Sequence, residues 1–153
     1  MGEASKEPTP GSLVWRLSIK WRVAVDRALA PLGLTHAQYV VLSSLYGMEY
    51  AGLHPSQREL ADHTSLEALY VSKLARALEA DGLIERTRGT VDTRTVRLVL
   101  TGRGRDVVVS AMATVQALQD RLLAPLGGRD DPRTAAFVRD LTALLDAPLD
   151  PPN

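Results

Sequence analysis

The sequence predicts a mainly α-helical fold with one small antiparallel β-ribbon, that is, an α+β chain. Apolar residues recur at helical spacing in most segments, and a serine or threonine followed three residues later by glutamate or glutamine marks three helix starts. Only residues 83–100 alternate with the period of two that is typical of strands. At 153 residues, the chain has the length of one ordinary domain with a hydrophobic core.

The composition excludes several classes of site. The chain has no cysteine, so it holds no disulfide, no thiolate zinc site and no catalytic cysteine. Its three histidines are scattered, and it has no Ser-His-acid motif or glycine-rich phosphate loop. We therefore expect neither an enzyme nor a cofactor, and no metal site unless one assembles across a dimer. Charged residues interrupt every apolar run before the roughly 18 residues that a membrane span needs, so we expect a cytoplasmic protein without membrane contact.

The first segments are an arm and a helix. Residues 1–11 combine proline and glycine with small polar residues, and we expect a disordered arm. Residues 12–30 then show an amphipathic helix that stops near Pro31 and Gly33. Its apolar stripe is predicted to be Leu17, Trp21, Ala24 and Ala28.

Three capping boxes predict the next helix starts: Thr35 with Gln38, Ser56 with Glu59, and Thr64 with Glu67. The helix after Thr35 reaches about residue 49, with an apolar side formed by Val40, Val41, Leu45 and Met48. The helix after Ser56 is short, holds Leu60 and Ala61, and leads by a tight turn into a third helix over about 65–81. This arrangement is typical of a helix-turn-helix.

The third helix has two different faces. Placed 100° apart, Val71, Leu74, Ala75 and Leu78 form the buried stripe. Leu69, Ser72, Lys73 and Arg76 then lie on the opposite arc, with Tyr70 at its edge. These side chains suit contacts with phosphates and base edges, whereas an ordinary solvated face is the alternative.

The following ribbon is basic. Leu83–Thr87 and Val96–Leu100 read as strands that flank a polar tip from Arg88 to Arg94. Residues 84–105 hold six arginines against two acidic residues, which indicates either a solvated hairpin or a surface for an anion. A ribbon directly after a helix-turn-helix predicts a winged helix, whose tip arginine can enter a narrow minor groove.

The remaining residues predict two further helices. A long helix begins after Thr101–Gly104, and its seam is Val108, Ala111, Val115, Leu118 and Leu122. Asp131 and Pro132 start the last helix, whose apolar face is Phe137, Leu141, Leu144 and Leu145. We expect 35–104 to form the winged helix-turn-helix DNA-binding domain, 12–34 and 105–147 to form a helical dimerisation region, and 148–153 to be a disordered tail. Apolar stripes that the winged helix cannot cover predict a homodimer.

The motifs together resemble the MarR family of winged-helix transcriptional regulators. The matching residues are Leu34, Thr35, Gln38, Val41, Leu42, Leu45, Glu59, Leu60, Ala61, Val71, Ser72, Lys73, Leu74, Leu78, Glu79, Gly82, Leu83, Arg86, Asp92, Arg94, Leu100, Thr101 and Gly104. The resemblance implies a homodimer that binds a palindromic operator on double-stranded DNA, usually as a repressor, and responds to a small-molecule effector. The chain departs from the family pattern at Gly89 and Thr90, where an Asp-Pro pair is usual, and at Leu69 and Tyr70, where Ser and Thr are commoner.

Two sets of site residues follow. We expect DNA to be contacted by Leu69, Tyr70, Ser72, Lys73, Arg76, Arg88, Asp92 and Arg94. For a small ligand the candidates are Trp15, Trp21, Tyr39 and Tyr46, although aromatic residues on amphipathic helices are more often core. The alternative function is a winged-helix protein-interaction module without specific DNA binding, because the same fold serves both purposes.

Overall fold

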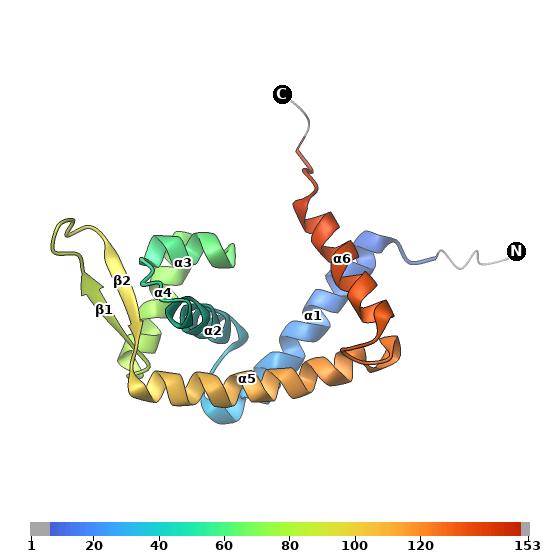
Figure 1. Cartoon of the computed structure of the whole chain (residues 1–153), viewed down its shortest axis with the longest axis horizontal. Coiled ribbons are helices and arrows are strands. Elements are labelled where there is room, and N and C mark those ends of the chain that lie inside the picture. Colours follow the sequence, from blue (N-terminus) through green and yellow to red (C-terminus); the bar gives the residue numbers. More distant parts are fainter. Residues whose placement is uncertain (1–6, 151–153) are drawn as a thin grey trace, which may run out of the picture. The chain divides into compact units, whose positions relative to one another are not determined.

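The structure is a computed structural model that describes residues 7–150. The parts of the predicted arm and tail at 1–6 and 151–153 lie outside these residues. Figure 1 shows the elements, which are α1 (Pro10–Leu29), η1 (Ala30–Leu32), α2 (His36–Tyr50), α3 (Gln57–Thr64), α4 (Ala68–Ala80), β1 (Ile84–Arg88), β2 (Val96–Leu100), α5 (Gly102–Leu123), η2 (Ala124–Leu126) and α6 (Pro132–Asp146). The chain divides into two compact units, the first ending at Val115 and the second beginning at Gln116, within α5. The prediction of a mainly helical α+β chain with a two-stranded ribbon is confirmed.

The first unit contains a winged helix. Helix α4 packs against α2 and α3, and the antiparallel β1–β2 ribbon follows it. The core shared by these elements consists of Val41, Leu42, Leu45, Leu60, Ala61, Val71, Leu74, Ala75, Leu78, Leu83, Ile84, Leu98 and Leu100. All four residues predicted for the buried stripe of α4 are among them.

Two of the three predicted capping boxes are confirmed. Thr35 Oγ1 accepts a hydrogen bond from Gln38 N at 3.2 Å, and Gln38 Oε1 accepts one from Thr35 N at 3.0 Å. Ser56 and Glu59 make the same reciprocal pair at the start of α3, at 3.1 and 2.6 Å. Hydrogen bonds from Ser56 therefore lower the pKa of the Glu59 carboxyl.

The third predicted capping box is wrong. Thr64 is the last residue of α3, and its hydroxyl donates to the Leu60 carbonyl oxygen at 2.8 Å instead of capping a new helix. The chain turns at Ser65, whose φ of 58° is left-handed, and α4 begins only at Ala68. Glu67, the N-cap of α4, makes no side-chain capping bond. The threonine can satisfy its hydroxyl within the preceding turn, so the local pattern does not decide which helix it serves.

Helix α1 differs from its prediction in start and phase. It begins at Pro10, because the Thr9 hydroxyl accepts from Ser12 N at 3.3 Å, so the last two residues of the predicted arm are helical. Its fully buried residues are Val25 and Leu29. The predicted stripe is wrong by one residue: Leu17 is exposed, and Trp21, Ala24 and Ala28 are only half-buried. Burying valine and leucine removes more apolar area from water than burying the neighbouring alanines.

Helix α2 keeps two of its four predicted apolar residues in the core. Val41 and Leu45 are fully buried, whereas Val40 and Met48 are half-buried. Leu42, which the prediction left out of the apolar side, is also fully buried. The buried surface of α2 is therefore wider than a single apolar stripe, because α1, α3 and α4 all pack against this helix.

The wing leads directly into α5. The Thr101 hydroxyl donates to the Gly82 carbonyl oxygen at 2.7 Å and accepts from Gly104 N at 2.9 Å, so α5 starts at Gly102, inside the predicted strand break. Glu49, at the end of α2, accepts from Leu100 N at 2.8 Å and pairs with Arg105 Nη2 at 2.9 Å. These contacts connect α2, β2 and the start of α5.

The second unit contains the C-terminal part of α5, η2 and α6. Gly127 and Gly128 adopt positive φ after η2, and Asp131 caps α6 by accepting from Arg133 N at 2.8 Å, as the Asp131–Pro132 start predicted. Asp120 and Arg129 pair at 2.6 Å. Phe137 and Leu141 of the predicted apolar face are half-buried, whereas Leu144 and Leu145 are exposed.

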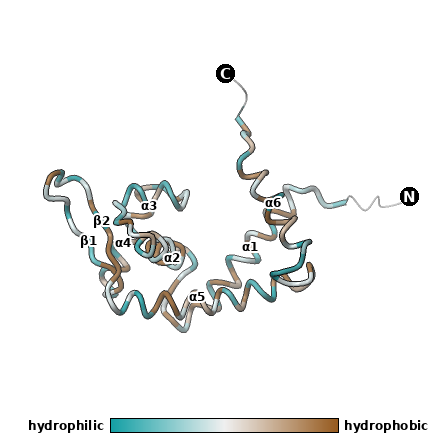
Figure 2. The backbone as a smooth tube through the Cα atoms, viewed as in Figure 1, coloured by the Kyte–Doolittle hydropathy of each residue, from teal (hydrophilic) through white to brown (hydrophobic). Residues whose placement is uncertain are grey.

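Figure 2 shows hydrophilic residues interrupting the hydrophobic ones along the long helices. Among the residues that the structure describes, no helix is long and apolar enough to cross a membrane.

Candidate nucleic-acid interface

The exposed side of α4 is set by its buried stripe. Because Val71, Leu74, Ala75 and Leu78 face the core, the residues on the opposite side of the helix are turned outward. Leu69, Tyr70, Lys73 and Arg76 are exposed and Ser72 is half-buried, so all five α4 residues expected to contact DNA have some exposed surface. The basic pair of this face is Lys73 and Arg76.

Arg76 lies back along its own helix. Its Nε donates to the Ser72 carbonyl oxygen at 3.4 Å and its Nη2 donates to Ser72 Oγ at 3.3 Å. Both bonds are long and exposed, so they contribute little to folding. The guanidinium can therefore exchange these contacts for an anionic partner at small cost.

The wing tip is a closed turn with an exposed arginine. Asp92 Oδ1 accepts from Arg94 N at 3.0 Å, and the Arg94 Nε lies 3.6 Å from the same oxygen. The Arg94 side chain is 94% exposed. Gly89 N donates to the Thr95 carbonyl oxygen at 2.9 Å, and a Cβ on Gly89 would lie 2.6 Å from the Asp92 carbonyl oxygen. Glycine at 89, where the family pattern differs, is thus required by the close approach of the two sides of this turn.

Arg88 supports the tip from the end of β1. Its Nη1 donates to the Thr93 carbonyl oxygen at 3.0 Å. Of the three wing residues expected to contact DNA, Arg94 therefore has the freest charged group, and Arg88 and Asp92 hold the turn on which it stands.

The wing is held against the helix-turn-helix at its base. Arg97 Nη1 donates to the His54 carbonyl oxygen at 2.6 Å and lies 4.0 Å from Glu59 Oε2. Ser56 forms an isolated antiparallel β-bridge with Arg97, and Leu98 N donates to the Pro55 carbonyl oxygen at 3.2 Å. The sequence prediction missed this role of Arg97. The only indication in the sequence is that the alternating pattern of the strand turns the Arg97 side chain away from the core.

A second set of hydrogen bonds connects the wing to α4. Arg86 donates from Nε and Nη2 to Glu79 Oε1, both at 3.1 Å, and Arg86 N donates to Glu79 Oε2 at 3.1 Å. The Arg86 guanidinium therefore lowers the pKa of the Glu79 carboxyl. Together with Arg97, this pair fixes the wing relative to the exposed face of α4.

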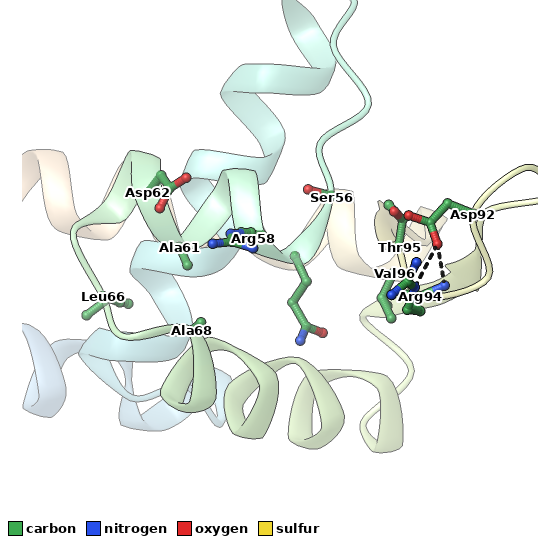
Figure 3. Close-up of a pocket in the computed structure, with 11 residues that line it drawn as sticks. Ser56, Arg58, Ala61, Asp62, Leu66, Ala68, Asp92, Arg94, Thr95 and Val96 are labelled. Carbon is green, nitrogen blue, oxygen red and sulfur yellow. Dashed lines mark hydrogen bonds and ion pairs between the residues drawn. The ribbon is translucent and has the colours of Figure 1, made fainter.

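A groove of about 780 Å³ lies between α3, the start of α4 and the wing (Figure 3). Its lining residues are Ser56, Gln57, Arg58, Ala61, Asp62, Leu66, Ala68, Asp92, Arg94, Thr95 and Val96. Figure 3 shows Asp92 and Arg94 on the wing side and Asp62 on α3. Arg58, an exposed cation on α3, was not among the residues expected to contact DNA, although its place two residues after a helix N-cap is visible in the sequence.

The four ligand candidates lie on two helices that pack against each other. Trp15 and Trp21 are on α1, and Tyr39 and Tyr46 are on α2. Trp15 is 67% exposed, whereas the other three are half-buried, and burial raises the pKa of the Tyr39 hydroxyl. None of the four lines the shallow cleft of about 510 Å³ on α1, which is formed by Leu13, Arg16, Leu17, Ile19 and Lys20.

Comparison with known proteins agrees with this architecture. The family model described as "MarR family" matches residues 34–96. An HTH-type transcriptional repressor of Mycobacterium tuberculosis is 35% identical over 144 residues, which cover 94% of this chain and 98% of the relative.

Solved structures are similar over nearly the whole chain. A Mycobacterium tuberculosis MarR family protein, in complex with salicylic acid, is 32% identical with a TM-score of 0.65, covering 91% of this chain and 98% of the other. Staphylococcus aureus MepR, in a complex with DNA, is 25% identical with a TM-score of 0.81, again covering 91% and 98%. With a relative this similar over almost its full length, the chain belongs to the MarR family of winged helix-turn-helix transcriptional regulators.

Proposed function

We propose that this regulator is a homodimeric repressor that binds a palindromic operator, with α4 in the major groove and the Arg94 wing tip in the minor groove. The observation that carries the proposal is that side-chain contacts hold the basic wing tip and the basic face of α4 to one winged helix. Arg86–Glu79 and Arg97–His54 fix the wing to the helix-turn-helix, so the face with Lys73 and Arg76 and the tip with Arg94 are presented together. An α-helix fits the major groove, and arginine suits a narrow minor groove.

Exposed apolar residues on the terminal helices support the dimer. In the first unit, Leu13, Val14 and Trp15 of α1 are exposed, and in the second unit Leu144 and Leu145 of α6 are exposed. Clusters of this kind on a soluble chain usually mark an interaction surface. A second copy of the chain would cover the same surfaces symmetrically and would present two α4 helices to a palindrome. Light scattering at low micromolar concentration should give twice the 16.6 kDa chain mass.

We also propose a small-molecule effector that changes operator affinity. The support is the salicylic acid complex of the similar M. tuberculosis protein. In this chain, Trp15, Trp21, Tyr39 and Tyr46 offer aromatic faces and hydroxyls on α1 and α2 for such a ligand.

Salt dependence of DNA affinity tests the DNA-binding proposal. Duplexes retained by the full chain are first selected from a genomic fragment library, and their affinity is then measured between about 50 and 200 mM salt. Removing one cation that neutralises a phosphate should flatten the slope of log affinity against log salt by about 0.9. A variant dimer that lacks one such cation in each half-site should therefore flatten the slope by about 1.8.

Lys73→Ala and Arg76→Ala should both show this flattening, whereas Arg139→Ala, an exposed arginine on α6, should not. Unchanged affinity and slope in both α4 variants would show that α4 is not the reading element. If the chain retains no duplex from the library even at about 50 mM salt, the result would favour a protein-interaction module instead.

A further inference from the structure

The first turn of α4 presents apolar groups to solvent. Leu69 is the second residue of α4 and is 83% exposed. Ala68 before it is also exposed, so the first two residues of α4 offer no polar side-chain group, and the Tyr70, Ser72 and Lys73 side chains supply the first hydroxyl and ammonium groups.

Helical phase places Leu69 on the proposed DNA-contacting face. Residues four and seven positions later, Lys73 and Arg76, lie on the same side of the helix. A single exposed leucine elsewhere would need no explanation. In a helix-turn-helix, however, the N-terminal residues of the recognition helix are the ones that reach base edges.

The chemistry of leucine limits what it can recognise there. Its side chain offers no hydrogen-bond donor or acceptor, and the apolar group that a base pair presents in the major groove is the C5-methyl of thymine. We propose that Leu69 reads a thymine methyl in each operator half-site, so that the operator carries thymine at that position. This inference rests on the proposed function, because it requires α4 to lie in the major groove.

Deoxyuridine substitution tests the contact directly, since it removes only the methyl group. The probe is the tightest duplex that the full-length chain selects from a random-sequence pool. Each thymine is replaced in turn by deoxyuridine, and the affinity of each duplex is measured. At one position per half-site, we expect binding to weaken about fourfold, the factor for one buried methyl-sized group, and about fifteenfold when both half-sites are changed.

The same scan with Leu69→Ala separates this residue from its neighbours. The uracil penalty should vanish at that position and persist at any other sensitive thymine. Because Leu69 is exposed and alanine is at least as good a helix former as leucine, the melting temperature should not fall. Leu149→Ala, another exposed leucine but outside the helices, should keep the wild-type scan.

Two results would be decisive against the proposal. Either no thymine shows a uracil penalty, or the penalty stays in Leu69→Ala. If it stays there and disappears in Tyr70→Ala, the methyl contact belongs to Tyr70. If the chain selects no duplex at all, the proposed DNA-binding function itself is wrong. This result differs from a selected duplex whose affinity does not change when uracil replaces thymine, which contradicts only the role of Leu69.

Discussion

Replacing Arg94 by alanine removes a guanidinium that contributes little to folding. The side chain is 94% exposed, and its ion pair with Asp92 joins Nε to Oδ1 at 3.6 Å. An exposed pair of this kind is worth about 0–1 kcal/mol. The stronger contact in the turn, from Arg94 N to Asp92 Oδ1 at 3.0 Å, belongs to the backbone and remains in the variant. We therefore expect Arg94→Ala to melt at nearly the wild-type temperature.

The same substitution should weaken operator binding. Removing an arginine that makes a specific DNA interaction typically costs about 1–3 kcal/mol, which corresponds to roughly a 5- to 150-fold weaker affinity. Arg94→Lys should recover only part of this affinity, because an ammonium is more strongly hydrated and loses more hydration on entering a narrow groove. Asp92→Ala should show a smaller defect, since it removes the acceptor that orients the turn but leaves the guanidinium.

Fluorescence anisotropy with a selected duplex, at one fixed salt concentration, measures these affinities beside melting temperatures and light-scattering masses. Arg139→Ala serves as the control for removal of one exposed arginine. Wild-type affinity for Arg94→Ala would remove the wing tip from the mechanism. A large fall in melting temperature would show instead that the side chain supports the fold.

Two further predictions concern stability. A Cβ on Gly104 would lie 1.9 Å from the Leu83 carbonyl oxygen, so Gly104→Ala should lower the free energy of unfolding, measured by urea titration, by about 1–3 kcal/mol. Gly102 has open space around it, and Gly102→Ala should not lower this free energy. Equal urea midpoints for the two variants would contradict the close packing at Gly104. Burial lowers the pKa of His36 below 6.5, against the opposing effect of Asp26, so the folded chain favours the neutral imidazole. Stability should therefore fall as the pH drops from 6.5 to the folded-state pKa, and His36→Asn should flatten this fall. Identical pH profiles for wild type and His36→Asn would refute the assignment.

The features that the sequence determined by itself are local. The Thr35 and Ser56 capping boxes form between residues three apart, so the hydrogen-bonding groups that define them are adjacent in any helix start. The buried stripe of α4 was equally predictable, because a helix with one apolar arc can only bury that arc.

The sequence predictions were wrong where the same residues allow two alternative local structures. Thr64 has the pattern of a capping residue, but its hydroxyl bonds within α3, and the left-handed Ser65 sets the real turn. In α1, the apolar residues Ala24 and Val25 are neighbours, and packing against α2 selected the phase that buries Val25 and Leu29. Helical periodicity alone cannot choose between two overlapping stripes.

The tertiary structure alone decided how the proposed interface is held together. Arg97 meets the carbonyl oxygen of His54, and Glu49 meets Leu100 N, although 43 and 51 residues separate these partners along the chain. No periodicity or motif encodes such a contact, because it exists only after the wing has folded back onto the start of α3 and the end of α2. The outward residues of α4 could thus be predicted from the sequence, whereas their position relative to Arg94 depends on contacts that charged side chains make with backbone groups far away in the chain.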